Sequence, residues 1–484
     1  MAFAGRTAEE SQLLGALRDG VMRLAHVEIR PRQIDSEGHI PGSVLSALAE
    51  MGAFGLSIPE EHGGAGFSLQ GVCSAVATLA EVDRSVATTI GLHLGLGTRG
   101  LIAYGSESLR AKHLPELAAG RKIAAFAATE AGAGSDLAAI ATRAIEVAPG
   151  RLRIDGTKIY VTNGGLAHVF TIAAATPMLG GARRGHSLIL LEKTDAGLEA
   201  TGEEHKLGLR GSSTTCLHLE GVEVPADRII GEAGRGMEQL HQVLAWGRTA
   251  MAAGCCGAAR IALQLTAAHV ATRRQFGRPL AAFEVVRGQL ADMAALVFAM
   301  EALVEHTCAA ESDAPLLAAR SRAAKIFCSE ADWEVCDLAV QLHGGAGFIE
   351  ETGLPLLLRD ARITRIFEGA NDVLLVSHGA AEAAAPTVLR TTLGERIAQH
   401  RDELRARLGV RLMTRQRLLH RLGRLLVLRE AVEAAALRAE AIGTEEARAL
   451  ALHFAQLASS RAAPLFAEPV AGIDAISLAL TEPR

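Results

Sequence analysis

Apolar residues recur at helical spacing through the first 122 residues of the chain. The clearest predicted helical face carries Leu13, Leu14, Leu17, Val21 and Leu24. The same spacing predicts helices over 44–51, 70–82 and 88–104, and a loop over 58–66, where a proline and several glycines interrupt the pattern. We therefore expect an N-terminal helical domain over residues 1–122.

The pattern of apolar positions changes to period two over residues 123–234. Alternating apolar residues flank Asp155-Gly156, which predicts a hairpin turn at that dipeptide. Short apolar runs over 169–174 and 187–191 are typical of buried strands, and residues 216–224 alternate again. This segment is predicted to be a central β domain.

Long helical patterns return over residues 235–385. Helices are predicted over 237–268, 283–310, 316–342 and 371–385, with a loop over 271–280. Residues 386–484 form a helical extension, in which 390–429 contains eleven arginines and only three acidic residues. Leucines mark one face of this stretch. Such a helix either makes a peripheral contact with anionic lipid or packs on the rest of the protein, and the sequence leaves both open.

Composition narrows the class of protein. A hydrophobic fraction of 49% supports a large core, and a net charge of -5 gives no sign of nucleic-acid binding. The seven cysteines form no C-x-x-C pair, which indicates a reducing compartment and no metal site. The N-terminus carries charges where a signal peptide needs apolar residues, and the longest apolar stretch is shorter than a membrane span. We expect a soluble, cytoplasmic protein.

Glu368 is the residue with the clearest chemical potential. It lies between Ile366-Phe367 and Gly369, and a carboxylate among apolar groups loses hydration and becomes a stronger base. The alternative is an acidic cap on the following helix. Arg248, on an otherwise apolar helix, requires an anionic or carbonyl partner. The glycine- and hydroxyl-rich loop 129–136 either presents N–H groups to a phosphate or planar ring, or is an ordinary turn.

Six motifs in order resemble the acyl-CoA dehydrogenase family. They lie at 59–66, 129–136, 162–164, 273–277, 341–347 and 365–369. The resemblance implies an N-terminal helical domain, a central β barrel over 123–234 and a C-terminal four-helix bundle over 235–385. The Phe367-Glu368 pair and the chain after residue 385 are most similar to the very-long-chain branch.

The resemblance also implies FAD as the cofactor. Expected contacts to FAD in the same subunit are Thr129, Gly134, Ser135, Tyr160, Thr162, Ala370 and Asp372, with alanine at 370 where many relatives have threonine. A second set would reach the FAD of a neighbouring subunit, which implies a homo-oligomer, expected to be a dimer. These residues are Arg273, Phe276, Gln341, Gly344 and Gly345.

By the same resemblance, Glu368 is the catalytic base that removes the α-proton of an acyl thioester while flavin N5 accepts the β-hydride. Some members of the family carry their base on the helix predicted over 237–268, and they have glutamate where this chain has Gly247. An electron-transfer protein would be the acceptor. Expected substrate-binding residues are Ser135, Arg248, Phe367, Gly369 and the pair Gly97 and Gly100, whose spacing matches two glycines that open the acyl pocket in the very-long-chain branch.

Several alternatives remain open at this point. Ala245 replaces a polar residue that relatives often place near the pantetheine, so the carrier of the medium-to-long acyl chain is coenzyme A or an acyl carrier protein. Reduced flavin that reacts with oxygen would make the protein an oxidase or monooxygenase. A non-catalytic scaffold or assembly protein with the same fold is the remaining reading.

Overall fold

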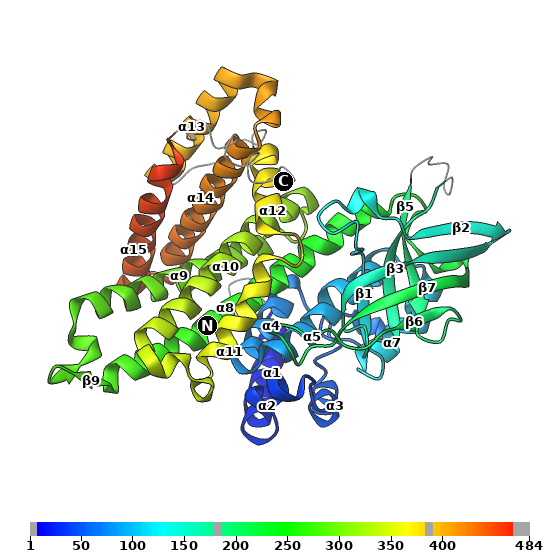
Figure 1. The fold of residues 1–484 in the computed structure, drawn as a ribbon, viewed down its shortest axis with the longest axis horizontal. Coiled ribbons are helices and arrows are strands. Elements are labelled where there is room, and N and C mark those ends of the chain that lie inside the picture. Colours follow the sequence, from blue (N-terminus) through cyan, green and yellow to red (C-terminus); the bar gives the residue numbers. More distant parts are fainter. Residues whose placement is uncertain (1–6, 178–184, 383–390, 468–484) are drawn as a thin grey trace, which may run out of the picture.

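The computed structural model describes residues 7–177, 185–382 and 391–467. The N-terminal helical domain is confirmed and precedes a central sheet, which lies at one side of the molecule with long helices extending from it (Figure 1). Its helices are α1 (Ala8–Val27), α2 (Pro31–Glu37), α3 (Gly42–Glu50), α4 (Leu69–Val82), α5 (Arg84–Leu92), α6 (Arg99–Tyr104) and α7 (Glu107–Ala118).

The single helix predicted over 88–104 is divided. A π-helical turn, His93–Gly97, separates α5 from α6. Two glycines of this segment permit close packing: a Cβ at Gly95 would lie 3.4 Å from the Cα of Gly247, and one at Gly97 would lie 2.9 Å from the Cβ of Ala124. The cost of glycine in this segment is thus offset by contact with a neighbouring helix and strand.

The central domain is an open sheet within the described residues, not the expected barrel. Its order is β6-β7-β3-β2-β4-β5-β8, with β1 paired to β4, and the end strands β6 and β8 are the shortest, so they offer few groups for closure. The strands are β1 (Ala124–Ala127), β2 (Arg143–Ala148), β3 (Arg151–Thr162), β4 (Val169–Ala175), β5 (His186–Glu192), β6 (Leu198–Ala200), β7 (Thr214–Pro225) and β8 (Ile229–Ile230).

The hairpin predicted at Asp155-Gly156 is wrong, because β3 runs unbroken through it. The chain turns earlier, at Gly150, whose φ is 72°. Asp155 instead accepts a 2.7 Å hydrogen bond from the N–H of Gly221 at a bulge between β3 and β7. A Cβ at Gly156 would lie 2.4 Å from the hydroxyl of Thr142. The glycine therefore permits a close approach and does not mark a turn.

The predicted helices of the C-terminal region are confirmed over the described residues. They are α8 (Gly236–Thr272), α9 (Glu284–Cys308), α10 (Ala314–His343), α11 (Leu354–Ala361) and α12 (Asn371–Glu382), with a small hairpin, β9 (Arg274–Gln275) and β10 (Arg278–Pro279), after α8. The predicted end of the last helix, 383–385, lies outside the described residues. α8 has the length and apolar composition of a membrane span, but 56% of that stretch is buried inside the protein, where α4, α9 and α10 pack on it.

The extension contains α13 (Thr392–Leu408), α14 (Gln416–Ile442) and α15 (Glu445–Ala462). α14 packs closely on α12 (Figure 1), because a Cβ at Gly379 would lie 2.2 Å from the carbonyl oxygen of Leu419 and one at Gly423 would lie 2.1 Å from that of Leu375. The leucine face predicted from the sequence is largely buried against the protein: Leu404, Leu412, Leu419, Leu422 and Leu426 are all buried. Of the two alternatives, packing therefore accounts for this apolar face.

Candidate active site

A cavity of about 400 Å³ lies where the three domains meet. α4 and α5 line one part of it, β1, β3 and the loop after β1 line another, and α8, α10 and α12 complete it. Nine of the residues predicted from the sequence line this cavity: Thr129, Gly134, Ser135, Tyr160, Thr162, Arg248, Phe367, Glu368 and Gly369. The structure thus brings together residues that are separated by up to 240 positions in the chain.

Glu368 occupies a tight turn between α11 and α12, and its φ of 56° is rare for a residue with a side chain. Arg248 fixes the turn, because its Nε donates a 2.9 Å hydrogen bond to the carbonyl oxygen of Glu368. Although the residue as a whole is half-buried, its Oε2 atom is fully buried and accepts no hydrogen bond within the described residues. Burial raises the pKa of Glu368 to about 7, against the opposing effect of Arg248 and Lys325.

Gly247 leaves room for this carboxylate. A Cβ at that position would lie 2.4 Å from a methyl carbon of Leu96 and 3.0 Å from the Oε2 of Glu368. Any side chain at 247 would therefore compete with the carboxylate for the same space. The absence of a side chain at Gly247 thus provides the space that the carboxylate of Glu368 occupies.

Lys325 is a functional candidate that the sequence reasoning missed. It is fully buried on α10, and its Nζ donates hydrogen bonds of 2.8 Å to the carbonyl oxygen of Gly369 and 2.6 Å to the Oδ1 of Asn371. Burial lowers the pKa of Lys325 to about 8, although Glu368 opposes that shift. A charged residue within an apolar helix was the signal that identified Arg248, and it applies equally to Lys325.

Cationic groups lie near Glu368 on the α8 and α10 side. Burial lowers the pKa of Arg248 to about 10, which Glu368 partly offsets, so this guanidinium remains charged at neutral pH. Arg322 of α10, a second residue missed from the sequence, lines the same cavity and lowers the pKa of Arg248 further by like-charge repulsion. This part of the cavity therefore favours negative charge that develops on a bound ligand.

The hydroxyl groups of Thr129, Ser135 and Thr162 line the opposite part of the cavity and make no hydrogen bonds within the described residues. The loop that carries the first two is anchored by Glu130, which accepts hydrogen bonds from Lys158 at 2.7 Å and from the N–H groups of Ala141 and Thr142. A Cβ at Gly134 would meet only Thr129, at 3.9 Å. An anchored loop whose hydroxyl groups have no protein partner among the described residues suits a planar ring or a phosphate group.

The residues expected to serve a neighbouring subunit lie outside this cavity. Arg273 and Phe276 belong to the region of the β9–β10 hairpin, at the end of the bundle away from the sheet (Figure 1). Gln341, Gly344 and Gly345 lie at the end of α10, and a stacked His269–His343 pair joins the two groups. Phe276 is 93% exposed and Phe348 is 83% exposed. Both sets therefore face outward at the same end of the molecule.

Two further expected contacts, Ala370 and Asp372, do not line the cavity. The side chain of Asp372 is 91% exposed and lies 3.1 Å from the ring of His420 in α14, so it faces the extension. Ala370 precedes α12, and its carbonyl oxygen accepts the N–H of Leu374. The structure therefore does not place these two residues at the cavity wall, although Gly369, Val373 and Leu374 beside them line it, and their role in cofactor binding stays a prediction.

Gly97 and Gly100 also lie outside the cavity. Gly97 packs on β1, and a Cβ at Gly100 would contact side chains of β4, β5 and α8 at 3.8–3.9 Å. Two other glycines line the cavity between α4, α5 and α8: Cβ atoms at Gly91 and Gly254 would each lie 3.5 Å from Val76. Gly91 and Gly254 thus line the cavity, whereas the substrate-binding role of Gly97 and Gly100 stays a prediction.

Comparison with known families gives matches over most of the chain. Models of the acyl-CoA dehydrogenase N-terminal, middle and C-terminal domains match residues 11–121, 125–222 and 234–383. The mouse "Very long-chain specific acyl-CoA dehydrogenase, mitochondrial" is 37% identical over 377 residues, which are 76% of this chain and 57% of that protein. The chain thus spans little more than half the length of that relative.

A bacterial relative matches over nearly its whole length. "Probable acyl-CoA dehydrogenase FadE25" from Mycobacterium tuberculosis is 38% identical over 360 residues, which are 74% of this chain and 92% of that protein. Among solved structures, an acyl-CoA dehydrogenase complexed with FAD from Bacillus anthracis superposes with a TM-score of 0.86 at 26% identity, and covers 99% of this chain and 92% of its own. The helical extension is therefore included in that structural match.

Proposed function

The chain belongs to the acyl-CoA dehydrogenase family, and we propose that it binds FAD and converts an acyl-CoA thioester to the trans-2-enoyl thioester. The observation that carries this proposal is the carboxylate of Glu368. It lines the cavity where the three domains meet, its Oε2 has no hydrogen-bond partner within the described residues, and burial raises its pKa to about 7. A base of this strength suits removal of a weakly acidic α-proton at neutral pH.

The residues that line the sheet side of the cavity fit FAD. The hydroxyls of Thr129, Ser135 and Thr162 and the open backbone around Gly134 offer donors without protein partners in the part of the chain described. When bound, FAD supplies an acceptor for the β-hydride. Thr162 and the adjacent Tyr160 would hold the edge and face of the flavin ring, and the 129–135 loop would bind its polar groups.

The turn at Glu368 would also polarise the thioester. The backbone N–H of Glu368 donates no hydrogen bond within the described residues, so it is available to the carbonyl oxygen of a substrate. Charge that develops on this oxygen would be stabilised by the N–H group and by the nearby guanidinium of Arg248. Phe367 and Leu96 would exclude water, which strengthens both interactions.

Anaerobic titration of the FAD-loaded protein with acyl-CoAs of increasing length tests this proposal. We expect bleaching of the flavin absorbance with at least one chain length and formation of the 2-enoyl product. An acyl carrier protein loaded with the same acyl group distinguishes the carrier, and peroxide formation in air would identify an oxidase. If no acyl thioester bleaches the flavin, the proposed reaction is wrong.

We propose a medium-to-long acyl chain, bound in the part of the cavity between α4, α5 and α8. Val76, Gly91 and Gly254 line this part, and the two glycines leave space beside the valine. Gly91→Leu should therefore shift the preferred chain length downward, whereas Gly100→Leu should not, because Gly100 lies outside the cavity. FAD content checks that both variants fold. A shift with Gly100→Leu alone would restore the assignment made from the sequence.

The exposed apolar residues at the end of the bundle support a homodimer. Phe276, Phe348 and Val285 are 93%, 83% and 73% exposed at that end, an unusual concentration for a surface in contact with water. Covering them with a second subunit would also place Arg273 and the 341–345 turn against a neighbour. Mass determination by light scattering should give twice the chain mass, and Phe276→Asp should give the monomer with reduced FAD affinity. We further propose an electron-transfer flavoprotein as the acceptor of electrons.

A further inference from the structure

Leu209 lines the active-site cavity from the loop between β6 and β7 in a conformation that leucine rarely adopts. Its φ is 49°, and its side chain is buried. A branched residue with positive φ is strained and persists only where the surroundings enforce its conformation. Glu368 shares this property, with a φ of 56°, on another wall of the same cavity.

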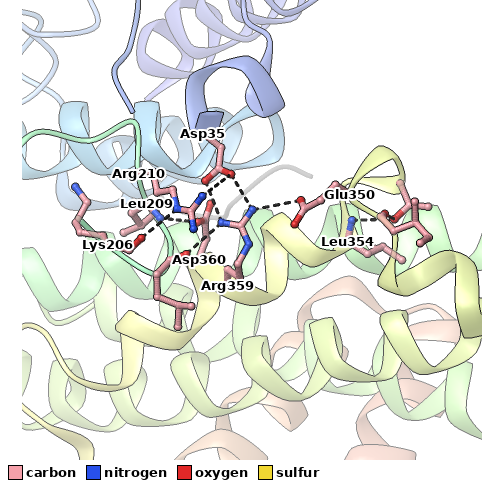
Figure 2. A network of polar contacts seen from close by, with 11 residues as sticks. Asp35, Lys206, Leu209, Arg210, Glu350, Leu354, Arg359 and Asp360 are labelled. Carbon is pink, nitrogen blue, oxygen red and sulfur yellow. Dashed lines mark hydrogen bonds and ion pairs between the residues drawn. The ribbon is translucent and has the colours of Figure 1, made fainter. Parts of the chain in front are cut away.

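Asp360, at the end of α11, holds the Leu209 loop directly. The N–H of Leu209 donates a 2.5 Å hydrogen bond to the Oδ1 of Asp360, whose side chain is only 3% exposed (Figure 2). The loop and the helix are also in backbone contact, because a Cβ at Gly208 would lie 2.5 Å from the carbonyl oxygen of Arg359. On the other side, the N–H and hydroxyl of Ser212 donate to the carbonyl oxygen of Leu209.

Ion pairs at the edge of this contact join the three domains. Arg359 of α11 binds Asp35 of α2 through two hydrogen bonds of 3.0 and 2.8 Å, and also binds Glu350 and the carbonyl oxygen of Leu207 (Figure 2). Arg210 of the loop lies 3.8 Å from the same Asp35. These outer contacts fix the domains relative to one another, but they do not touch the amide of Leu209.

The same short helix also leads to the base. After α11 the chain makes one 3-10 turn, Arg362–Arg365, and then reaches Glu368. Thr364, in that turn, donates a 2.6 Å hydrogen bond back to the carbonyl oxygen of Ala361 and lines the cavity. α11 is therefore attached at one point to Leu209 of the central domain and at another to Glu368, so its position sets the distance between these two walls.

We propose that Asp360 is a positioning residue: its carboxylate holds the amide of Leu209 so that the cavity wall formed by the central domain keeps a fixed distance from Glu368. This inference rests on the proposed function for its effect on rate. Reaction rates fall steeply when a reacting carbon is displaced by even an ångström from its base. Asp360 and Leu209 themselves take no part in the chemical step.

Three variants of the FAD-loaded protein test the inference. Asp360→Ala removes the acceptor of the Leu209 amide, and Asp360→Asn retains an oxygen acceptor without the charge. Asp35→Asn is the control that weakens the outer ion pairs and leaves the acceptor of the Leu209 amide in place. Two measurements are made on each: hydrogen–deuterium exchange of peptides that cover 206–213, and the rate constant of anaerobic flavin reduction at saturating acyl-CoA. The visible spectrum of the flavin is recorded in parallel.

For Asp360→Ala we expect faster exchange over 206–213, an altered flavin spectrum and at least a tenfold fall in the reduction rate constant. Asp360→Asn should restore the rate to within about threefold of the unmodified protein, although its exchange remains faster. Asp35→Asn should lower the melting temperature and leave the rate within about twofold. The rate should change because loss of the hydrogen bond to the Leu209 amide lets this cavity wall shift relative to Glu368, and small displacements lower reaction rates steeply.

Two results would overturn the inference. Unchanged exchange and spectrum in Asp360→Ala would show that the carboxylate does not hold the loop, and an equal loss of rate in Asp35→Asn would show general loosening of the domains. Should Asp360→Ala bind no FAD, unchanged exchange in Asp360→Asn would be decisive against it. If the unmodified protein is not reduced by any thioester, the proposed reaction fails, whereas exchange and spectrum still decide the role of Asp360.

Discussion

Replacement of the base by its amide, Glu368→Gln, should change stability and activity in opposite directions. The pKa of Glu368 is raised from 4.5 to about 7 by burial, so the folded protein binds this proton more tightly than the unfolded chain does. Folding stability contributed by this group is therefore highest below pH 4.5 and decreases as the pH rises towards 7. At 1.36 kcal/mol per pH unit, the ionised carboxylate costs at most about 3 kcal/mol above pH 7.

The glutamine variant has no charge to bury, so this cost is removed. At pH 8 we expect its melting temperature to rise by a few degrees, whereas at pH 5 it should match that of the unmodified protein. Its rate constant for anaerobic flavin reduction should fall by at least about 10²-fold, the lower limit for loss of a general base. Scanning calorimetry at the two pH values and stopped-flow absorbance measure these effects.

Exposed Glu351, in the 3-10 turn before α11, provides the control glutamate. Glu351→Gln should leave both the melting temperature and the rate close to those of the unmodified protein at pH 5 and pH 8. Equal stabilisation of Glu368→Gln at the two pH values would show that the charge of the base is not costly. Retained flavin reduction would remove Glu368 from its proposed role.

Three further predictions concern neighbouring features. The rate of flavin reduction should rise about tenfold per pH unit below pH 7 and level off above it, because the ionised form of Glu368 is the active one; stopped-flow traces that are flat from pH 5 to 8 would contradict this. Gly247→Ala should lower that rate more than tenfold while FAD content is retained, since the added Cβ would lie 3.0 Å from the carboxylate; full activity would refute the reasoning. Gly379→Val should lower the free energy of unfolding by about 1–3 kcal/mol in denaturant titrations, because its Cβ would lie 2.2 Å from the carbonyl oxygen of Leu419. Gly15→Ala is the control and should be neutral or stabilising, because no atom lies within 4 Å of the added Cβ.

Periodicity predicted the long elements well because burial of one face imposes a pattern on the sequence. α1, α4, α8 and α10 follow their predicted apolar faces to within a few residues. Local signals failed where tertiary contact decided the outcome. Asp155-Gly156 has the composition of a hairpin turn, but the glycine is required because Thr142 of another segment approaches it closely. A rule that considers only neighbouring residues cannot detect such a contact. Sheet closure likewise depends on pairing between distant strands.

Some residues of the candidate site could be identified from the sequence, and others only from tertiary contacts. Glu368 and Arg248 were identified because a charge among apolar residues is visible in the sequence, and Lys325 carries the same signal on α10. Asp360 and Leu209 gave no such signal, since their importance comes from one hydrogen bond between residues 151 positions apart. Spacing alone does not say which face of a glycine-rich helix meets the cavity, and Gly97 and Gly100 do not line it.

The basicity of Glu368 depends on where its cationic neighbours direct their hydrogen bonds. Arg248 and Lys325 both lie close enough to lower the pKa of the carboxyl group, yet burial outweighs them. Their N–H groups bind main-chain carbonyl oxygens, of Glu368 in one case and Gly369 in the other, and Glu368 forms no ion pair within the described residues. An ion pair with either cation would stabilise the carboxylate and lower its pKa, which would weaken it as a base. The two cations instead bind two successive carbonyl oxygens, those of Glu368 and Gly369, and so fix the strained turn that directs the carboxylate into the cavity. They leave its Oε2 free to accept a proton.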